Sequence, residues 1–196
     1  MILLKDCFRV VRPRYGAGAS AADGQSVRGG DAGRAGSSGA AGSDGGTGDL
    51  AGVDVLIDGS RIVAIGKNLH IPEDAKATAT VIDASRHVVL PGLVNTHHHF
   101  YQTLTRNVPS VQDAKLFDWL VYLYDVWKGI DEEAVYWSSM LAMAELAKTG
   151  CTLTTDHHYL YPRSFTGDLP GIQFRAAADI GLRFAPTRGS MSRSKK

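Results

Sequence analysis

The stretch that decides the fold is Val88-Val89-Leu90-Pro91-Gly92-Leu93-Val94-Asn95-Thr96-His97-His98-His99. An apolar run of this kind is typical of a buried strand, and this one ends in three consecutive histidines. Side chains of an extended strand alternate between its faces, so His97 and His99 are predicted on one side and His98 on the other. Two imidazoles at positions i and i+2 can bind one divalent ion. The stretch therefore predicts a strand that leads into a metal-dependent active site.

A solvated loop that binds metal only by chance is the simpler interpretation of three adjacent histidines. A second pair, His157 and His158, argues against it, because this pair also follows a predicted strand, residues 151–156. In β/α barrels the active site lies at the C-terminal ends of the strands. The end of a third predicted strand carries Arg188, which could bind a carbonyl or an anion, or could be an ordinary surface arginine.

Upstream of the histidine stretch, short apolar runs predict a small β-domain built from residues 1–15 and 49–87. Residues 53–57 and 61–65 flank an Asp-Gly turn, which is a strong hairpin pattern. Between the two parts, residues 16–48 hold 12 of the 22 glycines and almost no large apolar side chain, which predicts a flexible insertion. A phosphate-binding loop would need a strand before it, a helix after it and a Lys-Ser or Lys-Thr ending, and none of these is present.

Downstream, helical and strand patterns alternate. Apolar residues recur at helical spacing over 114–128, and a second helix is predicted with Asp131 as its N-cap and Gly150 as its stop. A third helix is expected over 171–181 and another strand over 182–187. This order is the pattern of parallel βαβ units and predicts an α/β fold.

Composition excludes several classes of protein. The net charge of +1 gives no sign of a nucleic-acid binder, and no run of about 18 apolar residues predicts a membrane span. The N-terminus becomes charged too early for a secretion signal. The two cysteines, Cys7 and Cys151, are expected to be buried free thiols, which favours a cytoplasmic location.

Two stretches carry a resemblance to a known family. Residues 91–102 resemble the first barrel strand of the amidohydrolase superfamily, and residues 58–66 resemble its small β-domain. Residues 116–120 and 156–157 are similar to its nucleobase and triazine deaminase branch. The resemblance implies a small N-terminal β-sandwich-like domain and then the first βα units of a (β/α)₈ TIM barrel over residues 88–191. Residues 192–196 are expected to be a basic tail.

The resemblance also implies roles for single residues. His97 and His99 would bind one Zn²⁺ or Fe²⁺ ion per site, which activates water for hydrolytic deamination of a purine-like nucleobase such as 8-oxoguanine. The substrate-binding residues would be Gln102, Trp119, His157 and Arg188, although Trp119 could equally be a helix-core residue. His98 would be structural.

The chain departs from the superfamily pattern in one respect. That pattern needs two further histidines, an aspartate and a proton-shuttling glutamate from later strands, and no catalytic acid or base is identifiable here. Because a complete barrel needs about 250 residues, we expect a truncated form that is inactive alone. A triazine, guanine or cytosine aminohydrolase and a non-catalytic metal- or partner-binding fragment are the alternatives. The expected partner is a small molecule, with no nucleic acid or membrane, and formation of a homo-oligomer is left open.

Overall fold

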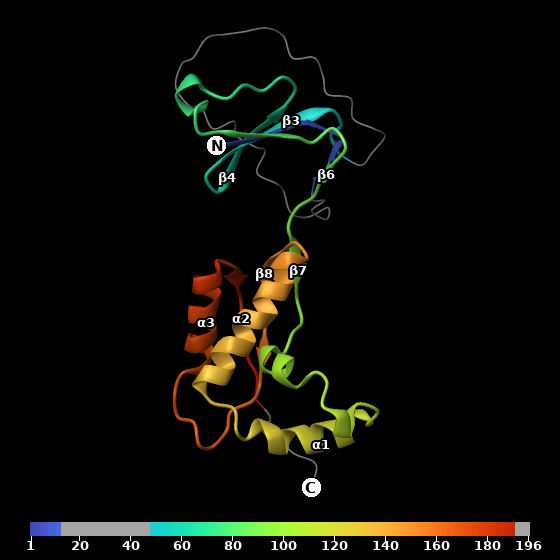
Figure 1. Ribbon diagram of the computed structural model, residues 1–196, viewed down its shortest axis with the longest axis vertical. Helices are drawn as coiled ribbons and strands as arrows, with labels where there is room; N and C mark the ends of the chain where they lie inside the picture. The colour runs from blue at the N-terminus through green and yellow to red at the C-terminus, as the bar shows by residue number, and fades with distance from the viewer. Residues whose placement is uncertain (13–47, 191–196) are drawn as a thin grey trace, which may run out of the picture. The chain divides into compact units, whose positions relative to one another are not determined.

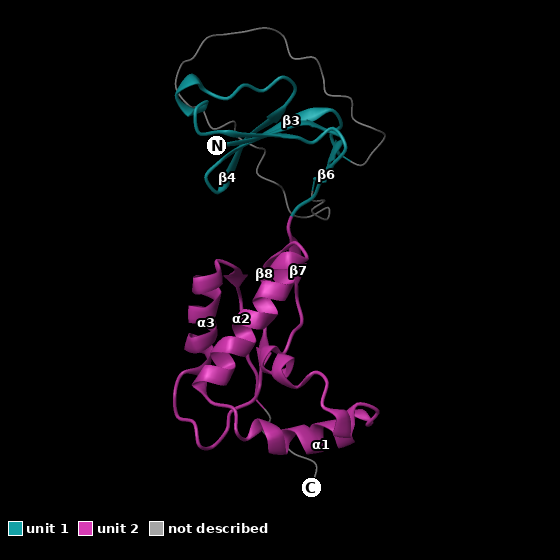
Figure 2. Cartoon of the chain, viewed as in Figure 1, with its two compact units in different colours: residues 1–91 teal, residues 92–196 magenta. Residues whose placement is uncertain are grey.

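The computed structural model describes residues 1–12 and 48–190 of the chain. These residues belong to two compact units, Met1–Pro91 and Gly92–Lys196 (Figure 2). The predicted flexible insertion 16–48, apart from Gly48, and the predicted tail 192–196 lie outside the described residues. The two cysteines are buried free thiols, as expected. No helix in the described parts of the chain is long and apolar enough to span a membrane.

The first unit contains a four-stranded sheet with the strand order β4-β3-β1-β5. Its strands are β1 (Ile2–Cys7), β3 (Val53–Asp58), β4 (Arg61–Gly66) and β5 (Thr80–Asp83). β3 pairs antiparallel with both β1 and β4, and β1 pairs parallel with β5. The predicted hairpin is present, with Gly59 at the turn in the left-handed conformation, φ +54°.

The predicted single strand over residues 88–96 is instead two strands. β6 (Val88–Val89) pairs with β2 (Arg9–Val10) in the first unit, whereas β7 (Leu93–Asn95) pairs with β8 (Cys151–Thr154) in the second. Pro91, which has no N–H to donate to a strand ladder, lies between them. The expectation of a buried strand is also wrong, since Leu93 and Val94 are each 56 % exposed. The reason is that β7 is an edge strand with β8 as its neighbour.

The second unit is built on a three-stranded parallel sheet of order β10-β8-β7 (Figure 1). The elements in chain order after β7 are η2 (Phe100–Thr105), η3 (Pro109–Val111), α1 (Leu116–Trp127), α2 (Glu132–Lys148), β8, β9 (His157–His158), α3 (Leu169–Ile180), β10 (Arg183–Phe184) and β11 (Thr187–Arg188). Helices α2 and α3 lie side by side and share an apolar core with Phe100, which confirms the expected βαβ arrangement. The strands expected over 151–156 and 182–187 are shorter than predicted, and β9 and β11 continue them as a separate parallel pair.

Helix ends follow local chemistry. The Asp131 side chain accepts a hydrogen bond from the Ala134 amide at 2.8 Å, which confirms the predicted cap of α2. α3 begins two residues earlier than predicted, because the Asp168 side chain caps it and Pro170 fits its first turn. Gly181 ends α3 with φ +76°.

Candidate metal centre

The three histidines lie between the end of β7 at Asn95 and the start of η2 at Phe100. Although they are outside the strand, their backbone is still bonded to the neighbouring segment. The Thr155 amide donates to the Asn95 carbonyl at 2.9 Å, and the His157 amide donates to the His98 carbonyl at 2.8 Å. These bonds continue the parallel pairing of β7 with β8 and hold the histidines against β9.

His97 and His99 come together as expected from their i and i+2 positions. Their ring centroids are 4.9 Å apart with an interplanar angle of 81°. Two imidazoles that bind one zinc ion through nitrogens at about 2.0–2.1 Å have centroids about 5 Å apart. The separation therefore suits a shared ion, and their role as metal ligands stays a prediction.

His157 brings a third imidazole to this pair. Its ring centroid is 4.8 Å from that of His97 and 6.1 Å from that of His99. Among the described residues, no group of three histidine, cysteine, aspartate or glutamate side chains is arranged to hold a metal ion. A catalytic zinc usually has three protein ligands, so the residues present fit a part of such a site.

Backbone carbonyl groups determine which ring nitrogens are available. His99 Nδ1 lies 2.9 Å from the His157 carbonyl oxygen, and His157 Nε2 lies 3.3 Å from the Thr96 carbonyl oxygen. A carbonyl oxygen can only accept, so each of these nitrogens carries the hydrogen. His99 therefore keeps a lone pair on Nε2, which is the arrangement common in metal-binding histidines. The short distance from His99 Nδ1 to the His157 carbonyl oxygen is the observation that best fits the pair to a metal.

His98 has different surroundings. Its ring packs edge-on against Phe100 at a centroid distance of 5.0 Å, and its buried Nδ1 has no hydrogen-bond partner within residues 1–12 and 48–190. Burial, more than the neighbouring His99 and Arg106 charges, lowers the pKa of His98. A ring held in this way is consistent with the predicted structural role.

Gln102 lies beside the histidines. It lines a cavity of about 310 Å³ together with His97, His98, His99, Thr103 and Arg106. Its side-chain Nε2 donates to the hydroxyl of Tyr159 at 3.1 Å, and the Tyr159 ring packs edge-on against His99 at 5.0 Å. The structure thus connects Gln102 to His99 through Tyr159. Tyr159 is a site residue that the sequence analysis did not identify.

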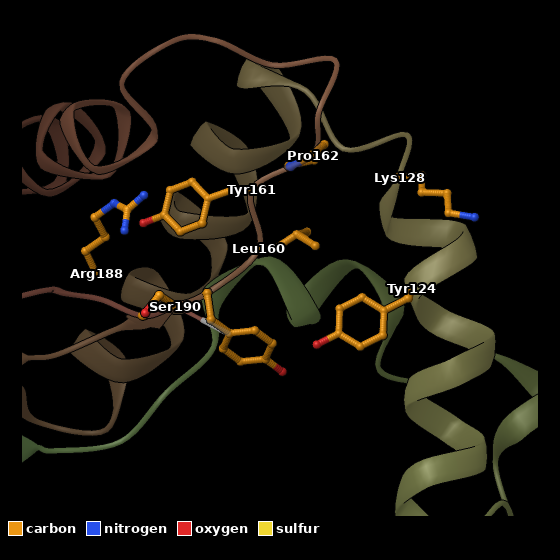
Figure 3. Close-up of a pocket in the computed structure, with 9 residues that line it drawn as sticks. Tyr124, Lys128, Leu160, Tyr161, Pro162, Arg188 and Ser190 are labelled. Atoms are coloured by element: carbon orange, nitrogen blue, oxygen red, sulfur yellow. The ribbon is translucent and has the colours of Figure 1, made fainter. Parts of the chain in front are cut away.

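Arg188 lies in a neighbouring cavity rather than beside the histidine pair. This cavity of about 400 Å³ is shown in Figure 3, where Arg188 lies next to Tyr161 and the Lys128 side chain points away from both. The Arg188 guanidinium is 4.4 Å from the centroid of the Tyr161 ring. A third cavity, of about 360 Å³, is lined by His99 and His157. It shares four lining residues with the Arg188 cavity: Tyr124, Tyr159, Gly189 and Ser190.

Trp119 lines none of these three cavities. Its ring packs edge-on against Trp127 at 5.5 Å, within the cluster that contains buried Leu123 and Tyr101. This packing fits the alternative prediction, in which Trp119 is a helix-core residue and not a substrate-binding one.

Asp156 is the second residue that the sequence did not single out. It is completely buried, and burial raises its pKa. Next to it, buried His158 has a pKa lowered to about 4 by burial. Its Nδ1 lies 3.8 Å from Asp156 Oδ2, and neither ring nitrogen has a hydrogen-bond partner among the described residues. The signal that could have found Asp156 is its place at the end of a predicted strand, directly before the second histidine pair.

Comparison with known proteins gives several relatives. Over 148 residues the chain is 45 % identical to 8-oxoguanine deaminase of Pseudomonas aeruginosa, an alignment that covers 76 % of this chain and 32 % of that protein. It is 37 % identical to hydroxydechloroatrazine ethylaminohydrolase of Pseudomonas sp. strain ADP, covering 73 % of this chain and 31 % of the relative. The chain thus spans about a third of the length of these curated relatives.

Among solved structures, a mutant of the atrazine chlorohydrolase TrzN from Arthrobacter aurescens, in complex with zinc and atraton, superposes with a TM-score of 0.71. The match covers 99 % of this chain and 37 % of TrzN at 24 % identity, so it supports the fold alone. The model of the amidohydrolase family matches residues 88–196, which include the histidine run, Gln102 and His157. This match spans more than half of the 196 residues, and the chain therefore belongs to the amidohydrolase family.

Proposed function

We propose that this chain supplies the His97–His99 part of the active site of a metal-dependent aminohydrolase that acts on a purine-like nucleobase. The reaction is hydrolytic: a ring carbon loses its amino group as ammonia and gains an oxygen from water. The protein would use one zinc or ferrous ion per site and a small-molecule substrate. The free thiols of Cys7 and Cys151 support a location in the reducing cytoplasm.

The observation that carries the proposal is the paired imidazoles at the carboxyl end of β7. His99 donates through Nδ1 to the His157 carbonyl, which leaves Nε2 as the nitrogen available to an ion. The ring centroids of His97 and His99 are 4.9 Å apart, a separation that suits two imidazoles bound to the same ion. When bound, the ion would supply Lewis-acid activation of water near neutral pH.

The other residues of the chain would bind and orient the substrate. Gln102 offers an amide that can donate to and accept from the edge of a nucleobase ring, and its bond to Tyr159 limits its rotation. His157 and Tyr159 line the cavity next to His99, where a flat ring could stack on the aromatic side chains. Arg188 would reach a carbonyl or anionic substituent from the adjoining cavity.

The identity of 45 % with 8-oxoguanine deaminase favours a purine-like substrate. The relative at 37 % identity is an ethylaminohydrolase of a triazine, which makes a triazine ring the second candidate. Both reactions break a bond between a ring carbon and an exocyclic nitrogen, so the same residues would serve either.

Two measurements test the proposal. Zinc or cobalt added to the purified, metal-free chain should bind at one site per chain, and H97A and H99A should each abolish this binding. The exposed His70, which lies in the first unit, offers the matched control H70A, which should bind as the wild type does. Metal binding that survives in the double variant H97A/H99A would disprove the site.

The substrate is tested with the protein encoded by the full reading frame. Ammonia release is measured from 8-oxoguanine, guanine, cytosine and an amino-substituted triazine. The proposal expects the highest kcat/KM with 8-oxoguanine or another purine. A preference for the triazine would overturn the substrate assignment and leave the aminohydrolase class intact.

A further inference from the structure

The carboxylate of Asp156 is the most completely enclosed charged group near the histidines. Its side chain is 0 % exposed. Oδ1 accepts a hydrogen bond from the Phe100 amide at 2.8 Å, and Oδ2 accepts one from Gln173 Nε2 at 2.5 Å. Burial of a carboxylate is unfavourable unless hydrogen bonds compensate for the lost water. Both hydrogen bonds are therefore needed to stabilise Asp156 in its buried position.

The bond to Phe100 acts on the histidine run itself. Phe100 directly follows His99 and begins η2, where the chain turns out of its extended conformation. The side chain of His99, at the N-cap position, makes no capping hydrogen bond. The first amide of η2 is bonded instead to Asp156, which is 56 residues away in sequence. The carboxylate therefore fixes the point at which the histidine run ends and η2 begins.

The backbone around Asp156 links two further segments to the same place. Its carbonyl oxygen accepts from the Thr187 amide at 2.8 Å, which holds the strand that carries Arg188. The next residue, His157, donates its amide to His98 and accepts from the His99 ring. Gln173 reaches Asp156 from α3 and is itself completely buried. Three strand ends and one helix thus meet around Asp156, through its carboxylate and through the backbone of Asp156 and His157.

We propose that Asp156 is a positioning residue for the metal pair: through the Phe100 amide and Gln173 it holds the His99 imidazole in the orientation in which Nδ1 donates to the His157 carbonyl and Nε2 is left for an ion. It would bind neither metal nor substrate. The expected effect on metal affinity rests on the proposed function, because a ligand that is held less firmly binds metal more weakly. The geometric claim about His99 stands independently of any metal.

The conservative variant is D156N. Asparagine keeps an oxygen for the Phe100 amide, and its new NH₂ group would face Gln173. Gln173 Oε1 has no hydrogen-bond partner in the described part of the chain, so a rotation of this amide by half a turn would let it accept from the new donor. D156A removes both acceptors. The matched control is D168A, which removes another carboxylate that accepts from a backbone amide of the same unit, that of Gly171 at 3.0 Å, at the N-terminus of α3.

The test measures zinc affinity by competition with a chromophoric chelator, hydrogen exchange at the Phe100 amide and the thermal midpoint of each variant. D156A should lose roughly 10- to 100-fold in zinc affinity and expose the Phe100 amide to exchange. D156N should stay within about threefold of the wild type in zinc affinity. D168A should lower the thermal midpoint without a change in zinc affinity. Equal affinities for D156A and D168A, or equal losses for D156A and D156N, would overturn the proposal.

Two further measurements separate a failure of the positioning role from a failure to fold and from a failure of the metal site. If D156A does not fold, Q173A removes one of the two anchors of the carboxylate, and a smaller loss of zinc affinity is expected, whereas no loss would count against the proposal. If the wild type itself binds no zinc, the proposed metal site fails. The Nδ1 proton of His99, observed by NMR, then decides the positioning claim. It should exchange slowly in the wild type and in D156N and rapidly in D156A or Q173A.

Discussion

Gly92 allows β7 and β8 to approach each other, and its replacement by alanine should destabilise the second unit. A Cβ atom at position 92 would lie 2.2 Å from both Cγ2 and Oγ1 of Thr152 and 2.7 Å from its Cβ. Rotation of the threonine side chain offers no escape, because its Cβ, at 2.7 Å, does not move in that rotation. Thr152 is also held by Arg183, whose Nε donates to its carbonyl and whose Nη2 donates to its hydroxyl.

The size of the effect follows from this geometry. Overpacking of this kind typically costs about 1–3 kcal/mol in the free energy of unfolding. For a unit of this size the thermal midpoint would fall by roughly 5–20 °C. The bond from the Leu93 amide to the Gly150 carbonyl, 2.9 Å in the wild type, should be the first part of the β7–β8 ladder to weaken.

The chain has a built-in probe for this measurement. All three of its tryptophans, Trp119, Trp127 and Trp137, belong to the second unit, so urea unfolding followed by tryptophan fluorescence reports that unit selectively. In the T152G variant the side chain that would clash is absent. The double variant G92A/T152G should therefore be nearly as stable as T152G alone, whereas G92A should be clearly less stable than the wild type. A coupling energy within about 0.5 kcal/mol of zero would refute the close approach of the two strands.

Three further predictions concern single side chains. H98A should reduce zinc binding less than H97A or H99A, because the His98 ring packs on Phe100; a larger loss in H98A, measured by zinc titration, would contradict the assigned ligand pair. D131A should lower the stability of the second unit by about 1 kcal/mol in urea unfolding, since the Ala134 amide loses its cap, and an unchanged midpoint would argue against that bond. Buried His158 has a pKa of about 4 in the folded protein and about 6.5 when unfolded, so it contributes up to about 3 kcal/mol of stability above pH 6.5 that is lost as the pH falls toward 4. H158F should remove this slope between pH 6.5 and 4, measured by urea unfolding against the wild type, and an unchanged slope would contradict it.

Features that depend on neighbouring residues were predictable from the sequence. The cap at Asp131 and the turn at Gly59 are local, because a carboxylate bonds an amide three residues away and a glycine adopts a positive φ by itself. The closeness of His97 and His99 is also local, since two residues along an extended backbone return to the same side.

Pairing over long distances was not predictable. Residues 88–95 look like one strand, yet Val88 pairs with Arg9 and Leu93 with Cys151. Apolar composition alone does not distinguish an edge strand from a central one, so the exposure of Leu93 and Val94 was missed. The core position of Trp119 depends on its packing against Trp127, and helical spacing leaves that role undecided.

By itself the amino-acid sequence determined the α/β class, the N-cap of α2, the family resemblance and the pair of imidazoles at one strand end, because these follow from side-chain type and from periodicity over a few residues. Only the tertiary structure decided that His157 joins the pair, that its carbonyl orients the His99 ring and that Asp156 anchors Phe100. These contacts join residues 56 to 60 positions apart. They form only when parallel strands align their ends, and the register of that alignment is decided by packing across the whole unit.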